Sequence, residues 1–297
     1  MHLVADREGV IVEEDSLQDR ILEWLYGCKA GRVILRPLIS PVVSRLGGIL
    51  LDSRISRVLI APFVRRHSID LSQYEKSCYT SYNDFFTRRL LCGARHIEEC
   101  PEVFVSPCDG RLGVYKINGL RAFSVKHSRY TVFGLLKSRR LAKKYAGGYL
   151  WVFRLCVEDY HRYIYVDGGR ESKRVRIPGV FHTVNPAAGD RLPVYKENTR
   201  EYSILKSDNF GEIVQMEVGA MLVGRIENRP VRDRARRGQE KGKFAFGGST
   251  VILMTREGRV RPDEDILENS ARGIETKVSL GERIGVKPCG DNKPEGV

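Results

Sequence analysis

The feature that most constrains the fold is the pattern of the chain after residue 103, where short runs rich in Val, Ile, Tyr and Phe follow one another closely. Gly, Pro, Asn and Asp separate these runs, which read VFVSP, RLGVYKI, YLWVFRLCV, RYIYV, IVQMEVGAMLVGRI and STVILM. Many short strands with frequent turn signals are typical of meandering, mostly antiparallel pairing. One basic helix, at about residues 130–145, is expected to interrupt them. The sequence therefore predicts a β-rich, mostly antiparallel domain over residues 96–297.

Residues 1–95 have a different pattern and are predicted to be helical. Ser16 and Asp19 resemble a capping box with a shorter acid, and apolar residues follow at helical spacing, namely Leu17, Ile21, Leu22 and Leu25. Glycines and prolines then divide the segment into short helices. The expected fold class is α+β, with a helical N-terminal region followed by the β-rich domain.

The net charge of the chain is +13, from 50 Lys and Arg against 37 Asp and Glu. Basic proteins of this kind bind nucleic acid, anionic membrane surfaces or acidic substrates. Between residues 32 and 66 the arginines alternate with Ile, Leu and Val, which is typical of a helix lying among lipid headgroups. Stacking aromatics do not accompany these arginines, and this disfavours nucleic acid. The alternative is a helical subdomain that packs on the core with a solvated arginine face.

No segment of the sequence approaches the ~18 consecutive apolar residues of a membrane span. The first sixteen residues are acidic and lack the basic-then-apolar pattern of a secretory signal. Seven cysteines occur without a C-x-x-C pair or a Cys/His metal spacing, so we expect free thiols in a reducing cytosol and no metal site.

The stretch KFAFGGSTVILM, residues 243–254, has the pattern of a buried strand but contains two glycines followed by two hydroxyl residues. Interior glycines weaken a strand and usually mark a bulge, or a place where another group approaches the main chain. A β-bulge is the simpler interpretation of this stretch taken alone. Any further interpretation depends on the other motifs.

Four other stretches have the composition of loops that carry functional residues. They are SPCDGRL with Asp109, VEDYHRYIYVDGG with His161, FHTVNPAA with His182 and Asn185, and KENTREYSIL with Asn198 and Arg200. Each has a simpler explanation when it is taken alone. An Asp between Pro and Gly usually stabilises the turn itself, and a single His is usually a hydrogen-bonded structural residue.

Together these stretches resemble the phosphatidylserine decarboxylases, and they occur in the order of that family. The motifs that carry the resemblance are FFTRRL, SPCDGRL, DYHRY, HTVNP, ENTREY, QMEVGAMLVGRI and KGKFAFGGSTVIL. The last two are the most specific. The match covers most of the chain, from YNDFFTRRL at residues 82–90 to GIETKVSLGERIG.

The resemblance implies that Ser249 is both a nucleophile and the precursor of a cofactor. Its hydroxyl attacks the carbonyl of Gly248, and the resulting ester is eliminated to leave a dehydroalanine, which loses ammonia and becomes a pyruvoyl group. Without a Cβ, Gly247 and Gly248 can hold a strained main chain and expose the carbonyl to attack. Flanking strands are expected to keep the two cleavage fragments associated.

The activity implied is decarboxylation of phosphatidylserine to phosphatidylethanolamine through a Schiff base with the pyruvoyl group, which accepts the electrons that remain after CO2 is lost. The alternatives are a pyruvoyl-dependent decarboxylase of a soluble amino acid and a non-catalytic lipid-binding protein. The basic amphipathic N-terminal region favours a lipid substrate. The joint presence of Asp109, His161, Gly248 and Ser249 argues against the binding protein.

By the same resemblance, a histidine acts as the base for Ser249 and Asp109 orients that histidine. The sequence departs from the best-known branch of the family, whose motif D-Y-H-R-x-H has two histidines. Here the second position is Ile164. Either His161 serves both self-cleavage and the later proton transfer, or His182 takes one of these tasks. We favour His161 for the triad with Asp109 and Ser249.

Three further residues are predicted to bind substrate. Arg200 could hold the substrate phosphate or carboxylate, because a guanidinium fits either group; its alternative is a surface ion pair with Glu197 or Glu201. Asn185 could donate to the carboxylate, or else stabilise the turn before Pro186. Asn198 lies in the same motif as Arg200.

These expectations together describe a peripheral protein on the cytoplasmic face of the cell membrane, which binds phosphatidylserine in an anionic surface. No nucleic-acid partner is expected. A homodimer is compatible with the sequence, which leaves the oligomeric state open.

Overall fold

A computed structural model of the chain describes residues 2–14, 17–119, 123–125, 128–183, 194–220, 225–231, 233–245 and 249–288. A large sheet contains β1 (His2–Ala5), β2 (Ile11–Glu14), β4 (Gly110–Lys116), β7 (Tyr149–Leu155), β9 (Gly169–Glu171), β10 (Val175–Ile177), β11 (Arg200–Ser207), β12 (Gly211–Val218), β15 (Ser249–Thr255) and β17 (Glu275–Val278). Smaller sheets are formed by β3 (Val103–Val105), β16 (Arg261–Pro262) and β18 (Arg283–Val286), by β8 (Arg162–Ile164), β13 (Ile226–Asn228) and β14 (Glu240–Phe244), and by β5 (Phe123–Val125) and β6 (Ser128–Tyr130).

The helices are α1 (Leu17–Gly27), α2 (Lys29–Leu38), α3 (Pro41–Asp52), η1 (Arg54–Leu59), α4 (Ile60–Arg66), η2 (Leu71–Gln73), α5 (Tyr82–Phe86), α6 (Val132–Leu136), α7 (Arg139–Lys144), α9 (Val194–Glu197) and α10 (Glu264–Ala271). None of the helices in the described part of the chain has the length and apolar character needed to cross a bilayer.

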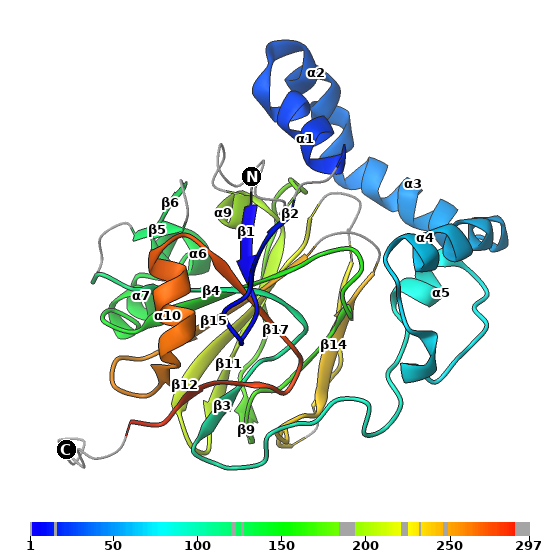
Figure 1. Ribbon diagram of the computed structural model, residues 1–297. Helices are drawn as coiled ribbons and strands as arrows, with labels where there is room; N and C mark the ends of the chain where they lie inside the picture. The colour runs from blue at the N-terminus through cyan, green and yellow to red at the C-terminus, as the bar shows by residue number, and fades with distance from the viewer. Residues whose placement is uncertain are drawn as a thin grey trace.

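The strands of the large sheet follow the order β10-β11-β12-β15-β7-β4-β17-β1-β2, and β9 also pairs with β11 (Figure 1). Every pair in this sheet is antiparallel except β1 with β17, which is parallel. The predicted α+β class, with a β-rich and mostly antiparallel catalytic domain, is therefore confirmed.

Both faces of the large sheet are buried, and β15 contributes to both. Alternate residues of a strand point to opposite faces. Val251 and Leu253 of β15 belong to an apolar cluster with residues of β3, β14 and α10, whereas Ile252 and Met254 belong to a second cluster with residues of α1, α6 and α7. The continuous apolar run VILM is thus explained by burial on both faces.

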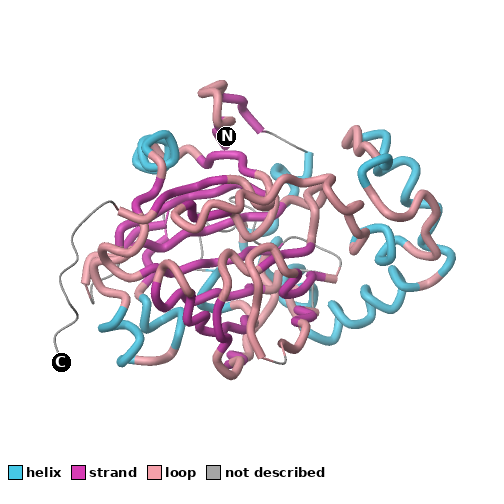
Figure 2. Tube along the Cα trace, turned by 90° about the horizontal axis from the view of Figure 1, so that it is seen from below, coloured by secondary structure: helices cyan, strands magenta, loops and turns pink. Residues whose placement is uncertain are grey.

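The N-terminal region differs from the expectation at its first residues. Strands β1 and β2 form a hairpin that joins the large sheet through β17, so residues 2–14 are not helical. Of the helices that follow, α1 and α2 lie above the strands in Figure 1 and α3 to α5 lie to their right, where helices are also seen in Figure 2. The division into domains at residues 1–95 and 96–297 remains a prediction.

The basic helix expected near residues 130–145 is two short helices, α6 and α7. Helix α6 ends where Lys137 adopts a left-handed conformation, with φ of 54°. Ser138 then caps α7 by accepting a hydrogen bond from the main chain of Leu141. The helical periodicity of the sequence did not reveal this interruption, because a single left-handed residue does not disturb the apolar spacing.

A buried ion pair joins the large sheet to the sheet of β8, β13 and β14. The Lys241 ammonium lies 2.6 Å from a carboxylate oxygen of Glu217, and both side chains are fully buried. Asn228 donates to the other oxygen of Glu217 at 3.1 Å. Burial raises the pKa of Glu217, although Lys241 opposes that shift. Each charge is therefore tolerated only because its partner is present.

We predict that Glu217→Ala strongly destabilises the protein, because it leaves the Lys241 ammonium buried without its main counter-ion. The expected loss of unfolding free energy is about 3–5 kcal/mol. The double variant Glu217→Leu with Lys241→Met should lose clearly less, since it removes both charges. Urea unfolding followed by circular dichroism measures both. A double variant no more stable than Glu217→Ala would show that the charge left unpaired is not the cause.

Candidate active site

The strand register brings the predicted motifs to one edge of the large sheet. Ser249, the first residue of β15, pairs with Leu155 at the end of β7, and the next residue, Thr250, pairs with Val218 at the end of β12. Val218 in turn pairs with Arg200 at the start of β11. On the other side of β7, the start of β4 pairs with the end of β7, with Arg111 opposite Arg154. Segments that lie far apart in the sequence therefore end side by side.

Ser249 occupies the centre of this edge. Its side chain is fully buried, and its hydroxyl has no hydrogen-bond partner among the described residues. Because side chains alternate along a strand, Ser249 faces the same side of the sheet as Val251 and Leu253. A buried hydroxyl without a partner is costly in a folded protein. A chemical role therefore explains the Ser249 hydroxyl at this position better than a structural role does.

His161 lies on the same side of the sheet, directly before β8. The main-chain N–H of Phe244 donates to the carbonyl of His161 at 2.9 Å, and Phe244 belongs to the apolar cluster that contains Val251. The ring of Phe86 stacks on the imidazole with 4.0 Å between ring centroids. The His161 side chain is fully buried.

The orientation of the His161 ring is set by a main-chain carbonyl. Its Nδ1 lies 2.9 Å from the carbonyl oxygen of Asp159. A carbonyl oxygen only accepts hydrogen bonds, so Nδ1 carries the hydrogen in this contact. In the neutral ring the nitrogen that can accept a proton is consequently Nε2. A general base requires such a nitrogen.

Asp109 lies at the same edge but is engaged elsewhere. One carboxylate oxygen accepts from Arg95 at 3.1 Å, and the other accepts from the main chain of Leu280 at 2.7 Å. Asp109 precedes Gly110, whose lack of a side chain allows close approach to β7, because a Cβ there would lie 2.8 Å from the carbonyl oxygen of Arg154. Two strand spacings separate the start of β4 from that of β15, about 10 Å. The hydrogen bonds of Asp109 thus orient the loop and do not include one to His161.

His182 lies on the opposite side of the sheet. Its Nδ1 is 3.2 Å from the hydroxyl of Tyr26 in α1, a residue of the second apolar cluster. Its Nε2 is 3.5 Å from Glu197. Burial lowers the pKa of His182, against the opposing effect of Glu197. The face that carries Thr250, rather than Ser249, is therefore the one nearer His182.

Asn198 joins His182 to the end of β12. Its side-chain oxygen accepts from the main-chain N–H of His182 at 2.8 Å, and its side-chain nitrogen donates to the carbonyls of His182 and Gly219 at 2.7 and 2.8 Å. These bonds satisfy a fully buried amide and fix two loops at the edge.

Arg200 is a buried structural cation. Its guanidinium donates to four main-chain carbonyls, at distances from 2.8 to 3.0 Å, those of Leu135, Lys196, Asn198 and Gly134. Burial lowers the pKa of Arg200 to about 10. This arrangement does not favour the expected contact with substrate. The alternative, an ion pair with Glu197 or Glu201, is also not found among the described residues.

Two predicted residues, Asn185 and Gly248, lie outside the described residues. Other side chains at the edge were not assigned a function from the sequence, namely Phe86, Arg88, Arg95 and Asp159. Phe86 and Arg88 belong to the motif FFTRRL, but the motif does not indicate that they contact His161 and the segment before it. That contact depends on the tertiary fold.

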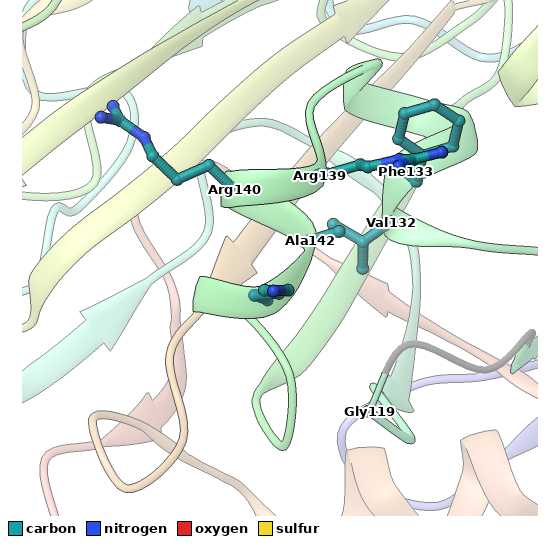
Figure 3. A pocket seen from close by; sticks show the side chains of 7 residues that line it. Gly119, Val132, Phe133, Arg139, Arg140 and Ala142 are labelled. Carbon is teal, nitrogen blue, oxygen red and sulfur yellow. The ribbon is translucent and has the colours of Figure 1, made fainter.

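A pocket of about 670 Å³ lies at helices α6 and α7 (Figure 3) and is lined by Gly119, Val132, Phe133, Arg139, Arg140, Ala142 and Lys143. Arg139 extends towards Phe133, whereas Arg140 points away from it. None of the predicted site residues lines this pocket, so we place the candidate active site at the sheet edge around Ser249.

Comparison with known proteins identifies the family of the chain. The family model described as phosphatidylserine decarboxylase matches residues 82–286. The chain is 44% identical over 276 residues to phosphatidylserine decarboxylase proenzyme 2 of Clostridium acetobutylicum, a match covering 93% of this chain and 94% of the relative. It is 40% identical over 276 residues to the phosphatidylserine decarboxylase proenzyme of Clostridium tetani, with 91% and 93% covered.

A third relative, the phosphatidylserine decarboxylase proenzyme of Desulfitobacterium hafniense, is 39% identical over 278 residues, with 92% of this chain and 93% of the relative covered. Identity of this level over almost the whole chain, together with the matching family model, confirms what the order of the motifs predicted: the chain belongs to the phosphatidylserine decarboxylase family.

Proposed function

We propose that the chain is a proenzyme that cleaves itself between Gly248 and Ser249, and that the product decarboxylates phosphatidylserine to phosphatidylethanolamine. The observation that carries this proposal is the buried hydroxyl of Ser249, which has no partner among the described residues and lies on the side of the sheet where His161 lies. The relatives bear the name proenzyme, which supports self-processing.

In the cleavage step, Nε2 of His161 removes the hydroxyl proton of Ser249, and the oxygen attacks the carbonyl of the preceding residue. The hydrogen bond from Nδ1 to the Asp159 carbonyl keeps the correct nitrogen available. We assign the orienting task to this carbonyl, because Asp109 is engaged with Arg95 and Leu280. Asp109 then fixes the loop beside the site.

A pyruvoyl group made from Ser249 fits the position of that residue. The orphan hydroxyl lies in a buried, largely apolar environment, which excludes water from the reacting atoms. Such a group supplies an electron sink for the decarboxylation of an amine-bearing substrate. His161, on the same side of the sheet, is the residue that we assign to later proton transfer, and His182 is assigned to the structure of the opposite side.

The position of β15 supports the proposal that the two fragments stay together after cleavage. This strand lies between β12 and β7 and pairs with both along almost its whole length. Strand β17 of the same C-terminal fragment lies between β4 and β1. Cleavage before Ser249 breaks one peptide bond but leaves these four ladders intact, so we propose that the fragments stay associated.

The surface of α2, α3 and η1 supports a peripheral contact with the membrane. It exposes many apolar side chains, with Ile55 82% and Val58 71% exposed, and with Val33, Ile34, Val42, Leu46, Ile49, Leu50 and Leu59 around them. Monomeric soluble proteins rarely expose apolar residues so densely. The exposed Arg36, Arg54 and Arg57 make no ion pair with another described residue. Anionic headgroups can therefore neutralise them.

This surface is flanked by two helices that contact the edge of the sheet around Ser249, one on each side of it. Tyr26 of α1 contacts His182, and Phe86 of α5 stacks on His161. The helices between α1 and α5 (Figure 1) carry the exposed apolar residues. A lipid in a membrane bound by these helices would have its headgroup beside the edge of the sheet. This arrangement favours a phospholipid over a soluble amino acid as substrate.

We predict that Ser249→Ala abolishes chain cleavage, whereas Thr250→Val leaves it unchanged. The two residues form a matched pair, because both are buried with hydroxyls that lack partners among the described residues, but they face opposite sides of the sheet. Intact mass spectrometry distinguishes one chain from two fragments with a blocked N-terminus on the smaller. Cleavage of Ser249→Ala, or an uncleaved wild-type chain, contradicts the proposal.

We also predict that the fragments separate only after unfolding. On native size exclusion the cleaved protein should elute as one species, because the interstrand ladders of β15 and β17 survive the cut. In strong denaturant the fragments should elute apart. Release of the C-terminal fragment from folded protein would argue against these pairings as the cause of association.

A third prediction concerns the membrane contact. Ile55→Glu combined with Val58→Glu should reduce flotation with phosphatidylserine vesicles at least tenfold, because each buried side chain of this size contributes about 1.5–3 kcal/mol. Val10→Glu is the control, since Val10 is exposed in the turn between β1 and β2.

Activity on free serine should be negligible beside activity on phosphatidylserine vesicles. Equal turnover of both would support a soluble substrate instead.

A further inference from the structure

We propose that Arg88 is a positioning residue for His161, which acts through the main-chain carbonyl of Asp159. The inference rests on the proposed function, since it assigns His161 the role of base. Arg88 belongs to the segment that follows α5, more than seventy positions before His161 in the sequence. Its guanidinium nevertheless reaches the loop that carries this histidine.

The Arg88 side chain is 2% exposed and lies between two aromatic rings. The centre of its guanidinium is 4.7 Å from the ring centroid of Tyr74 and 4.9 Å from that of Phe85. Such cation–π contacts hold the plane of the group in place. Its Nη2 donates to the carbonyl oxygens of Glu158 at 2.9 Å and of Asp159 at 3.3 Å.

The carbonyl of Asp159 is shared between Arg88 and His161. It accepts from the imidazole Nδ1 at 2.9 Å and from Arg88 Nη2 at 3.3 Å. The carboxylate of the same residue accepts from Arg111 and from the main chain of Cys156, both at 2.7 Å. Because these hydrogen bonds hold the loop, the carbonyl of Asp159 keeps one orientation. That orientation decides which imidazole nitrogen is protonated.

The charge of Arg88 is not neutralised by a carboxylate. Among the described residues, Arg88 makes no ion pair, and its Nε and Nη1 have no hydrogen-bond partner. Arg162, another buried arginine beside the loop, differs because Glu240 pairs with it at 2.8 Å. An uncompensated buried cation close to His161 favours the neutral imidazole, which is the form that can remove a proton.

Other charged groups near the His161 loop are largely paired with one another. Arg111 pairs with Glu158 and Asp159, Arg95 pairs with Asp109, and Arg162 pairs with Glu240. In the described part of the chain, the charge that faces this loop from the α5 segment without an ion pair is that of Arg88, since the neighbouring Arg89 lies 3.9 Å from Glu75. Removal of the Arg88 charge should therefore change the titration of His161, whereas loss of a purely structural contact should not.

The test uses Ser249→Ala, in which the chain stays intact, with 15N-labelled histidine observed by NMR. The signal of His161 is identified as the one that disappears when His161→Gln is added to Ser249→Ala. We expect the neutral form of His161 to be protonated at Nδ1. Adding Arg88→Met should raise the titration midpoint of this ring by about one pH unit, as expected for a cation a few ångströms away. Arg88→Lys should keep the midpoint, because it keeps the charge.

The matched control is Arg89→Met, since Arg89 is the exposed neighbour of Arg88 and should change nothing. In the chain with Ser249 intact, Arg88→Met should slow cleavage at least tenfold and move the acid limb of its pH profile upward. Arg88→Lys should restore the pH profile and part of the rate. If Arg88→Met does not fold, Arg88→Gln, which removes the charge but keeps an N–H donor, is measured in its place with the same expected rise of the midpoint.

An Nε2-protonated ring in the Ser249→Ala protein would overturn the inference. So would an unchanged midpoint with an unchanged pH profile in Arg88→Met, or a Lys variant whose midpoint moves as far as that of the Met variant. Failure of the proposed function looks different. In that case the wild-type chain remains uncut, while the NMR titration still reports whether Arg88 acts on His161.

Discussion

Strand β15 pairs with β12 on one side and β7 on the other, and the position of the proposed active site depends on this register. The register places Ser249 at the edge of the sheet, in the first position of a fully buried strand. Alternation along the strand then turns the Ser249 hydroxyl towards the side of His161 and turns Thr250 towards the side of His182. The same two ladders would hold the strand in place after the cleavage that we propose before Ser249.

The polar side chains at this edge divide into those that fix the main chain and those available for reaction. Asn198 and Arg200 donate to main-chain carbonyls. Asp109 accepts hydrogen bonds from Arg95 and from the main chain of Leu280. His161 is oriented by a carbonyl rather than by a carboxylate. A neutral acceptor sets the tautomer without adding a negative charge to the site, and the buried cation of Arg88 acts in the same direction.

The helical region connects this edge to a surface that exposes apolar and basic residues. Helix α1 meets the His182 side through Tyr26, and α5 meets the His161 side through Phe86. The exposed apolar residues lie on the helices between these two contacts. The helices that we propose to bind lipid therefore lie in the chain between the two helices that contact this edge of the sheet. Residues from the N-terminal third of the chain, Phe86 and Arg88 among them, contact residues of the β-rich domain.

The amino-acid sequence by itself determined the fold class and the family, and it singled out Asp109, His161 and Ser249 as candidate site residues, because short apolar runs, turn residues and motif order are local properties of a chain. It did not reveal that residues 2–14 complete the large sheet, that Arg200 is buried among carbonyls, or that Asp159 orients His161. These facts depend on which segments meet in space. The same side chain of arginine or aspartate can bind substrate or main chain, and only the tertiary structure decides which partner lies within hydrogen-bond distance.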